Sequence, residues 1–198
     1  AIDQIFGCPK ALIGMIHCPP FPGSPRYRGE TLEQIYDVCL RDAEGLIGNG
    51  LQGLVIENHG DVPFSKPDEI GPETSAFMSV VVDRIKRDFD VPVGINVLAN
   101  APIPAFAIAR ATGAAFIRVN QWANAYIANE GFMEGRAAQA MRYRSALHGE
   151  GIKVFADSHV KHGSHSITAD RSVAELTRDL EFFDADAVIA TGQRTGNS

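Results

Sequence analysis

The sequence lacks the features that mark several large classes of protein. No apolar run reaches the roughly 18–20 residues that a membrane-spanning helix needs, and the first residues show no signal-peptide pattern. Lys and Arg number 18 against 24 Asp and Glu, and the basic residues form no run. A formal net charge of −6 argues against a general binder of nucleic acid or of anionic membranes. We therefore expect no membrane span and no nucleic-acid partner.

Cysteine is also scarce. Cys8, Cys18 and Cys39 are odd in number and irregularly spaced, so a disulfide framework is not expected and a reducing cytoplasm is the expected location. Neither a G-x-S-x-G motif nor a Cys–His signature occurs, which leaves acyl-transfer hydrolysis without support.

What the chain does contain is an alternation of short apolar runs with amphipathic stretches. Helices are predicted over about 32–47, 72–88, 102–112, 133–148 and 173–183, after a short leading segment over residues 1–10. The apolar runs between them predict six strands, over 11–17, 51–56, 91–95, 115–117, 153–156 and 187–190. Strict strand–helix alternation predicts a parallel sheet, either open or closed into a barrel.

Each predicted strand ends in a polar residue. These residues are His17, Glu57, Asn96, Asn120, Asp157 and Thr191. They come together only if all the strand ends surround one opening at the carboxyl end of the sheet, which we call the mouth. A barrel provides such a mouth, and an open sheet provides it less well. We therefore predict a TIM (β/α)8-type barrel, as a single domain over residues 1–198. Only six βα units are present where eight are usual, so we expect the barrel to be incomplete at the C-terminus and the protein to be a homo-oligomer.

The stretch KVFADSHVKHGSH, residues 153–165, carries the densest set of ionisable groups. Asp157 ends a buried strand, where a carboxylate can act as a general base, and Glu57 holds the equivalent place on the second strand. Two carboxylates at one mouth can divide acid and base roles if their environments differ. The alternative is that both serve only as hydrogen-bond acceptors for loops.

Three histidines follow Asp157 in the pattern H-x-x-H-x-x-H. His159 and His162 are candidates for proton transfer, because imidazole titrates near neutral pH. With His165 they are also a possible divalent-metal site, although Gly163 and Ser164 argue against the helix that would bring the rings together. No cofactor beyond such an ion is expected. Lys161 either meets an anion or is an exposed loop lysine.

A second group of residues is suited to binding a polar substrate. Arg118 and Asn120 share one side of their strand; if that side faces inward, Arg118 needs a carboxylate partner such as Glu57 or Asp157. His17, Asn58 and Asn96 complete a polar ring for hydroxyl or amide groups. Trp122 and Tyr126 either stack on a planar ligand or pack under a long loop.

The last predicted strand leads into the loop TGQRTG, residues 191–196. Small residues at Thr191 and Gly192 expose backbone N–H groups and Arg194 adds positive charge, as in anion-binding loops. The loop matches neither the Walker A nor the G-x-G-x-x-G pattern.

Six blocks together resemble the BtpA/SgcQ family. They are GMIHCPPFPGSPRY, GLVIENHGDVPF, GINVLAN, FIRVNQWANAY, FADSHVKHGSH and ATGQRTG, in this order, and the resemblance extends over essentially all of residues 8–197. The resemblance implies a ribulose-phosphate-binding-type TIM barrel that is longer than this chain by its last two βα units. In related barrels those last two units contain the phosphate-binding site. The family takes its name from a photosystem I biogenesis protein.

The sequence therefore predicts one of two functions. The first is a barrel enzyme that acts on a small polar metabolite, a phosphosugar or a nucleoside-like compound, by isomerisation, aldol-type cleavage or glycosidic transfer. The second is a non-catalytic assembly factor of the kind that the family name implies, which should present an exposed apolar patch. The polar ring at the strand ends favours the enzyme.

Overall fold

The computed structural model describes residues 2–194, which form an α/β fold on one six-stranded parallel sheet. Its strands neighbour one another in chain order: β1 (Ile13–His17), β2 (Gly53–Glu57), β3 (Val93–Asn96), β4 (Phe116–Val119), β7 (Lys153–Ser158) and β8 (Ala187–Ala190). The sheet is a half-barrel, with β1 and β8 at its two edges. This confirms the predicted barrel-type α/β fold and its six parallel strands; within residues 2–194 the first five of these strands are each followed by a helix.

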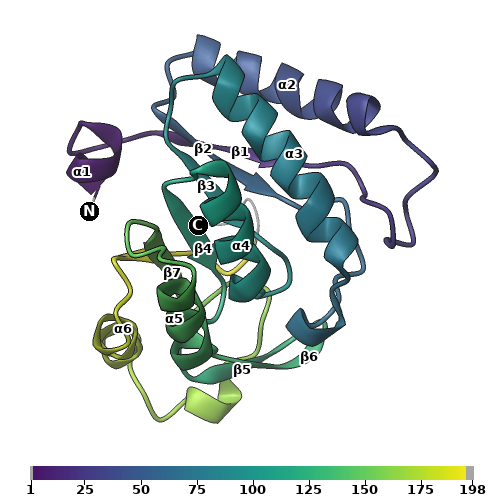
Figure 1. The fold of residues 1–198 in the computed structure, drawn as a ribbon. Helices are drawn as coiled ribbons and strands as arrows, with labels where there is room; N and C mark the ends of the chain where they lie inside the picture. The colour runs from purple at the N-terminus through teal and green to yellow at the C-terminus, as the bar shows by residue number, and fades with distance from the viewer. Residues whose placement is uncertain (1, 195–198) are drawn as a thin grey trace.

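The helices are α1 (Ile2–Phe6), α2 (Leu32–Gly48), α3 (Pro72–Asp88), α4 (Pro102–Thr112), α5 (Ala137–Ala146) and α6 (Val173–Phe182), with single 3₁₀ turns η1 (Pro67–Glu69) and η2 (Ser166–Thr168). Four of them, α2, α3, α4 and α6, lie within one residue of the ranges that the periodicity of the sequence predicts. Thr31 and Ser172 open α2 and α6 through capping boxes, and Gly113 ends α4 in the left-handed conformation. Helices α2 to α5 run along one side of the sheet (Figure 1).

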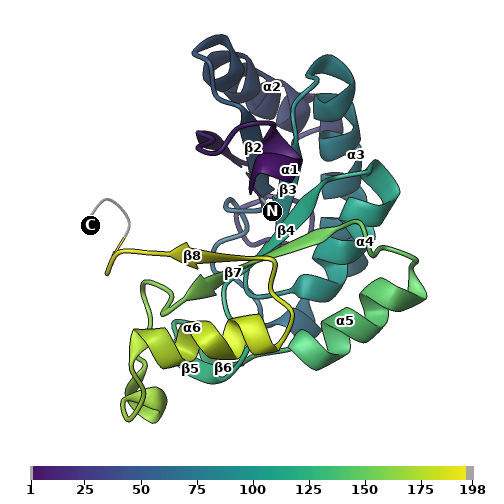
Figure 2. The same cartoon turned by 90° about the vertical axis from the view of Figure 1, so that its left-hand side faces the viewer.

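Alternate residues of each strand face two different apolar clusters. On β2, Leu54 and Ile56 belong to the large core under the helices, whereas Val55 belongs to a smaller cluster with Phe116 and Phe155. The side-chain period of two along a strand requires this division, so the second cluster marks the inner face of the half-barrel. Helix α1 packs three apolar side chains against that inner cluster, on the side of the sheet away from α3 (Figure 2): Ile2, Ile5 and Phe6.

One predicted helix is wrong over its first turn. The helix expected over 133–148 spans only Ala137–Ala146, and an antiparallel hairpin of β5 (Ala125–Ala128) and β6 (Gly131–Glu134) precedes it. Gly131 sits at φ +99°, a conformation that a helix excludes, and it closes the turn of the hairpin. Residues 1–10, expected as a leading segment, contain the short helix α1.

Across residues 2–194 we find no helix with both the length and the apolar character needed to traverse a bilayer.

The inner face allows a direct test of its packing. A methyl group added at Gly94 would overlap the ring of Phe116, which is itself stacked on Phe155 at 4.3 Å between ring centroids. We expect Gly94→Ala to lower the free energy of unfolding by ~1–3 kcal/mol because the core is overpacked, measured by urea denaturation. Adding Phe116→Leu should make the double variant more stable than the sum of the two single effects.

Gly45→Ala is the matched control for this substitution. Gly45 lies on the exposed side of α2 with open space around it, so alanine there should stabilise the protein by up to ~1 kcal/mol. Equal effects at Gly45 and Gly94, or no coupling between Gly94 and Phe116, would contradict the packing described.

Candidate functional site

The polar residues at the strand ends lie side by side because the sheet is in register. His17 is the backbone partner of Glu57, and Glu57 is the partner of Asn96. Ile95 pairs with Ile117, which sets Arg118 next to Asn96 on the following strand. The structure thus brings the predicted residues of four strands into one row at the carboxyl edge of the half-barrel, and Asn120 and Asp157 lie one step further up.

Arg118 and Asp157 form a buried ion pair with two hydrogen bonds. Arg118 Nε donates to Asp157 Oδ1 at 3.0 Å and an Arg118 terminal nitrogen donates to Oδ2 at 2.9 Å. The Asp157 side chain is 0% exposed and that of Arg118 is 14% exposed. Burial lowers the pKa of Arg118, but the bonds to Asp157 and the nearby charge of Glu57 outweigh it, so the pKa lies above its ordinary value. Asp157 is therefore the carboxylate partner that Arg118 needs.

Asp157 has a third donor, Asn120 Nδ2, at 3.3 Å. A carboxylate that accepts from three donors is committed to holding its neighbours in place. The geometry favours Asp157 as an anchor for Arg118 over Asp157 as the carrier of a proton.

Glu57 has different surroundings. Its Oε2 accepts from Asn96 Nδ2 at 2.6 Å, and its Oε1 lies 3.7 Å from His17 Nε2. The His17 side chain is 50% exposed whereas that of Glu57 is 7% exposed, so the pair joins a buried carboxylate to an imidazole that reaches solvent. Such a pair can exchange a proton with a ligand at the mouth.

His59 also belongs to this site, and sequence reasoning missed it. Its ring stacks on that of His17, with 4.3 Å between centroids. Burial and the proximity of His17 lower the pKa of His59. His59 follows Glu57 by two residues in the sequence E-N-H. It was missed because the candidate residues were chosen at the ends of predicted strands, and no strand ends at His59.

Two buried amide oxygens lack a hydrogen-bond partner among the described residues. They are Asn96 Oδ1 and Asn120 Oδ1. Because a carboxylate only accepts hydrogen bonds, Glu57 and Asp157 orient both amides with the nitrogen toward themselves, and this leaves each oxygen without a donor. Buried polar atoms are nearly always satisfied, so each oxygen is placed to accept a hydrogen bond from a ligand or from a bound water.

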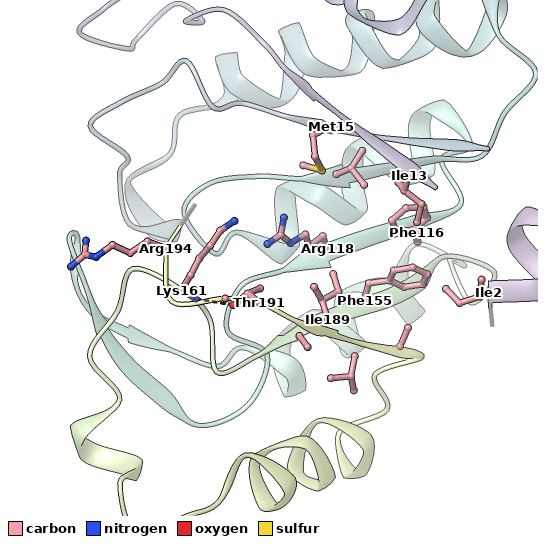
Figure 3. A pocket seen from close by; sticks show the side chains of 15 residues that line it. Ile2, Ile13, Met15, Phe116, Arg118, Phe155, Lys161, Ile189, Thr191 and Arg194 are labelled. Atoms are coloured by element: carbon pink, nitrogen blue, oxygen red, sulfur yellow. Dashed lines mark hydrogen bonds between the residues drawn. The ribbon is translucent and has the colours of Figure 1, made fainter. Parts of the chain in front are cut away.

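A cavity of about 710 Å³ opens on the inner face beside this row (Figure 3). Apolar side chains such as Met15, Phe116 and Phe155 line one part of it, and Arg118 and Lys161 point into its other part. The side chain of Arg194 extends away from them (Figure 3). The volume suits a small metabolite, and the cationic groups suit an anionic one.

Two loops join to form the cationic part of the cavity. The backbone N–H of Lys161 donates to Thr191 Oγ1 at 3.0 Å, and that of His162 donates to the carbonyl of Gln193 at 3.2 Å. Thr191 therefore holds the Lys161 loop in place, and Gly192 lines the cavity beside it. Thr195 and Gly196 of the predicted anion-binding loop lie outside the described residues.

The structure does not gather the imidazoles of His159, His162 and His165 into a metal site. His159 and His165 instead stack at 3.9 Å, and His165 Nε2 lies 2.8 Å from the carbonyl of Val160. His159 and His162 have positive φ, so the segment is a tight loop in which three-residue spacing does not align side chains. Within residues 2–194, the group of three side chains close enough to hold an ion is His17, Glu57 and His59.

Three other predicted contacts with ligand turn out to be internal. Asn58 exchanges hydrogen bonds with both backbone groups of Leu98 and donates to Asp61, so its amide holds loops together. Trp122 is fully buried and donates to the carbonyl of Phe183. Tyr126 stacks on His165, and burial raises its pKa to about 12. For the two aromatic residues, the packing interpretation is the right one.

The profile of the BtpA family matches residues 8–198. The chain belongs to the BtpA family. It is 41% identical over 188 residues to an uncharacterized protein of Pyrococcus horikoshii, covering 95% of this chain and 70% of that protein. It is 35% identical over 194 residues to the photosystem I biogenesis protein BtpA of Synechocystis, covering 98% of this chain and 66% of that protein.

Solved structures with the same fold are TIM barrels of low sequence similarity. An N-acetylmannosamine-6-phosphate 2-epimerase from Clostridium perfringens aligns with a TM-score of 0.51 at 14% identity, over 94% of this chain and 62% of its own. A mandelate racemase/muconate lactonizing enzyme-like protein from Rubrobacter xylanophilus aligns with a TM-score of 0.58 at 14% identity, over 94% of this chain and 44% of its own. The chain spans less than two thirds of either barrel, and the likeness shows the fold alone.

The ion pair between Arg118 and Asp157 sets an expectation for stability. We expect Asp157→Ala to lower the free energy of unfolding by ~3–5 kcal/mol, because it leaves a buried guanidinium without its partner. The double variant Asp157→Ala/Arg118→Met should recover a large part of this loss in urea denaturation.

Asp83→Ala is the control, since Asp83 pairs with Arg87 on the exposed face of α3 and should cost less than ~1 kcal/mol. If Asp157→Ala costs no more than Asp83→Ala, the pair is not the anchor described here.

Proposed function

We propose that this protein is an enzyme that acts on a small anionic metabolite of the phosphosugar or nucleoside-like class. The observation that carries the proposal is the pair of buried amide oxygens of Asn96 and Asn120 without a partner among the described residues, which lie in the row of strand ends between the buried carboxylates of Glu57 and Asp157. A scaffold gains nothing from such atoms, because each costs free energy until a donor reaches it. Hydroxyl groups of a sugar are donors of the required kind.

In this proposal one side of the mouth binds the phosphate and the other side transfers the proton. Lys161 supplies positive charge for a phosphate, and Arg118, whose charge Asp157 offsets, adds N–H donors. Thr191 and Gly192 lie on the adjoining loop, whereas the Arg194 side chain extends away (Figure 3). Glu57 carries the proton together with His17, since its Oε1 is the carboxylate oxygen nearest an imidazole that reaches solvent. In this proposal Asp157 is a positioning residue, and His159 and His162 take no part.

The partners of the two carboxylates favour some of the predicted reaction classes over others. Glycosidic transfer by the usual route needs two carboxylates free to act on either side of one bond. Asp157 is not free, because it accepts from Arg118 and Asn120. A single carboxylate–imidazole pair, separated from the cationic side of the mouth by Asn96, is suited to proton transfer at a carbon or hydroxyl away from the phosphate, which favours isomerisation or aldol-type cleavage.

Assembly of a photosystem complex is the second candidate function. It draws on the printed name of the Synechocystis relative and on two exposed aromatic side chains of the α6 end, Phe182 at 83% and Phe183 at 42% exposure. The proposed enzyme accounts for the buried amides, whereas an assembly role does not. A cytoplasmic location and a homo-oligomeric state stay predictions.

The test is a thermal-shift panel of sugar phosphates, the same sugars without phosphate, nucleosides and inorganic phosphate. A ligand at about 100 times its Kd stabilises the folded state by ~2.7 kcal/mol and raises the Tm visibly. We expect a sugar phosphate to stabilise wild type and Glu57→Gln but not Lys161→Ala. Lys10→Ala is the matched control, because Lys10 is exposed and precedes β1 at the opposite end of the sheet.

Glu57→Gln should then abolish turnover of the metabolite that the panel identifies while leaving its binding in place. Silence of wild type across the whole panel would contradict the enzyme and favour the assembly role.

A further inference from the structure

The mouth contains a side-chain cluster that the proposed function uses only in part. His17 ends β1, Glu57 ends β2, and His59 lies two residues beyond Glu57. One ligand atom from each of the three lies within 4.8 Å of the other two. We propose that His17, Glu57 and His59 form a binding site for a divalent transition-metal ion of the Zn²⁺ class, with a coordination position left open toward the mouth.

The donor set and its spacing fit such an ion. Two imidazoles with one carboxylate are a known three-ligand set for zinc sites that keep an open position. Ligand atoms about 2.0–2.1 Å from a tetrahedral zinc ion lie about 3.4 Å from one another. His17 Nε2 and Glu57 Oε1, at 3.7 Å, are already near that separation.

The backbone holds the two histidine-bearing segments against each other. The N–H of Cys18 donates to the carbonyl of Glu57 at 2.8 Å, and the N–H of Gly60 donates to the carbonyl of Cys18 at 3.0 Å. A Cβ at position 60 would collide with backbone atoms of Cys18, Pro19 and Pro20, so only glycine permits this approach. The loop that follows β1 and the loop that follows β2 thus place His17 and His59 next to each other without help from a ligand.

Neighbouring side chains orient the three ligands. Asn96 Nδ2 binds Glu57 Oε2 at 2.6 Å, which leaves Oε1 as the oxygen that faces His17. The ring of Phe64 contacts His59 edge-on at 6.0 Å between centroids, and His17 stacks against His59. A hydrogen bond such as the one from Asn96 fixes the orientation of a ligating carboxylate and raises the affinity for the ion.

An ion here changes the chemistry of the mouth. A cation with an open position polarises a carbonyl or hydroxyl group of a ligand, or lowers the pKa of a bound water. With an ion bound, Glu57 would be a metal ligand, and the proton transfer assigned to Glu57 in the proposed function would pass to a water on the ion. The cation site shares the mouth with the proposed function but does not depend on it, because binding of an ion is measured without any reaction.

The test is isothermal titration of EDTA-stripped protein with ZnCl₂, and with MgCl₂ for comparison. We expect one Zn²⁺ per chain and weaker binding of Mg²⁺, which prefers oxygen ligands. His59→Asn and His17→Asn should each weaken Zn²⁺ binding by about tenfold or more, and Asn96→Ala by ~10–100-fold. The Tm of each variant establishes that it is folded.

His148→Asn is the matched control. It removes an exposed imidazole after α5, and asparagine tolerates the positive φ found there. Its Zn²⁺ affinity should equal that of wild type. Zinc binding that survives both His59→Asn and His17→Asn, or that is lost in His165→Asn, would overturn the proposal, as would no binding by wild type.

Repeating the metabolite panel in EDTA separates the two proposals. Stabilisation by a sugar phosphate without zinc binding refutes the cation site and leaves the enzyme. One zinc per chain at these residues, with no response to any metabolite, supports the cation site and removes the support for the proposed substrate.

Discussion

The ion pair between Arg118 and Asp157 is the interaction on which the mouth of this half-barrel depends. Burying two charges is costly, and the pair is retained only because two hydrogen bonds and a third from Asn120 compensate. Once Asp157 neutralises Arg118, Glu57 is the carboxylate at the mouth without a cationic side chain bound to it, and its neighbours are imidazoles and an amide. The two strand-end carboxylates thus differ in role because their partners differ, although both are buried.

On three strands, β2, β4 and β7, a charged residue of the mouth follows two positions after an apolar residue of the inner face. Val55, Phe116 and Phe155 form the apolar layer of the inner face, and two residues further along each strand come Glu57, Arg118 and Asp157. Since residues two apart share a face, each strand passes from apolar packing to charge within one step. The apolar layer keeps water away from beneath the charged one, which strengthens every electrostatic interaction above it.

Sequence patterns predicted the sheet and most helix bounds because these depend on local periodicity. Helix α3 and helix α4 lie over the predicted residues, whereas the hairpin of β5 and β6 was missed because its strands of four residues lie in what reads as a loop. Only the strand register decides which carboxylate pairs with Arg118. Arg118 is the backbone partner of Phe155, so Asp157 lies two residues further along the neighbouring strand. His59 was missed for another reason. It ends no strand, and its place is set by contacts of Gly60 with Cys18 and the two prolines, which no periodicity encodes.

The two sides of the mouth constrain how a ligand can lie. The positive charge of Lys161 and the N–H groups of the Arg118–Asp157 pair lie on one side, and His17, Glu57 and His59 lie at the other end of the row, with the free oxygen of Asn96 between them. A symmetrical dianion would leave the imidazole end and the amide oxygens unused. In the proposed function, a molecule with a phosphate at one end and hydroxyl or carbonyl groups at the other would use every part. Its phosphate would meet Lys161 and Arg118, its hydroxyls would donate to the amides, and its reacting atoms would reach Glu57. Such a molecule has one favourable orientation, and this directs the proton-transferring groups to the end remote from the phosphate.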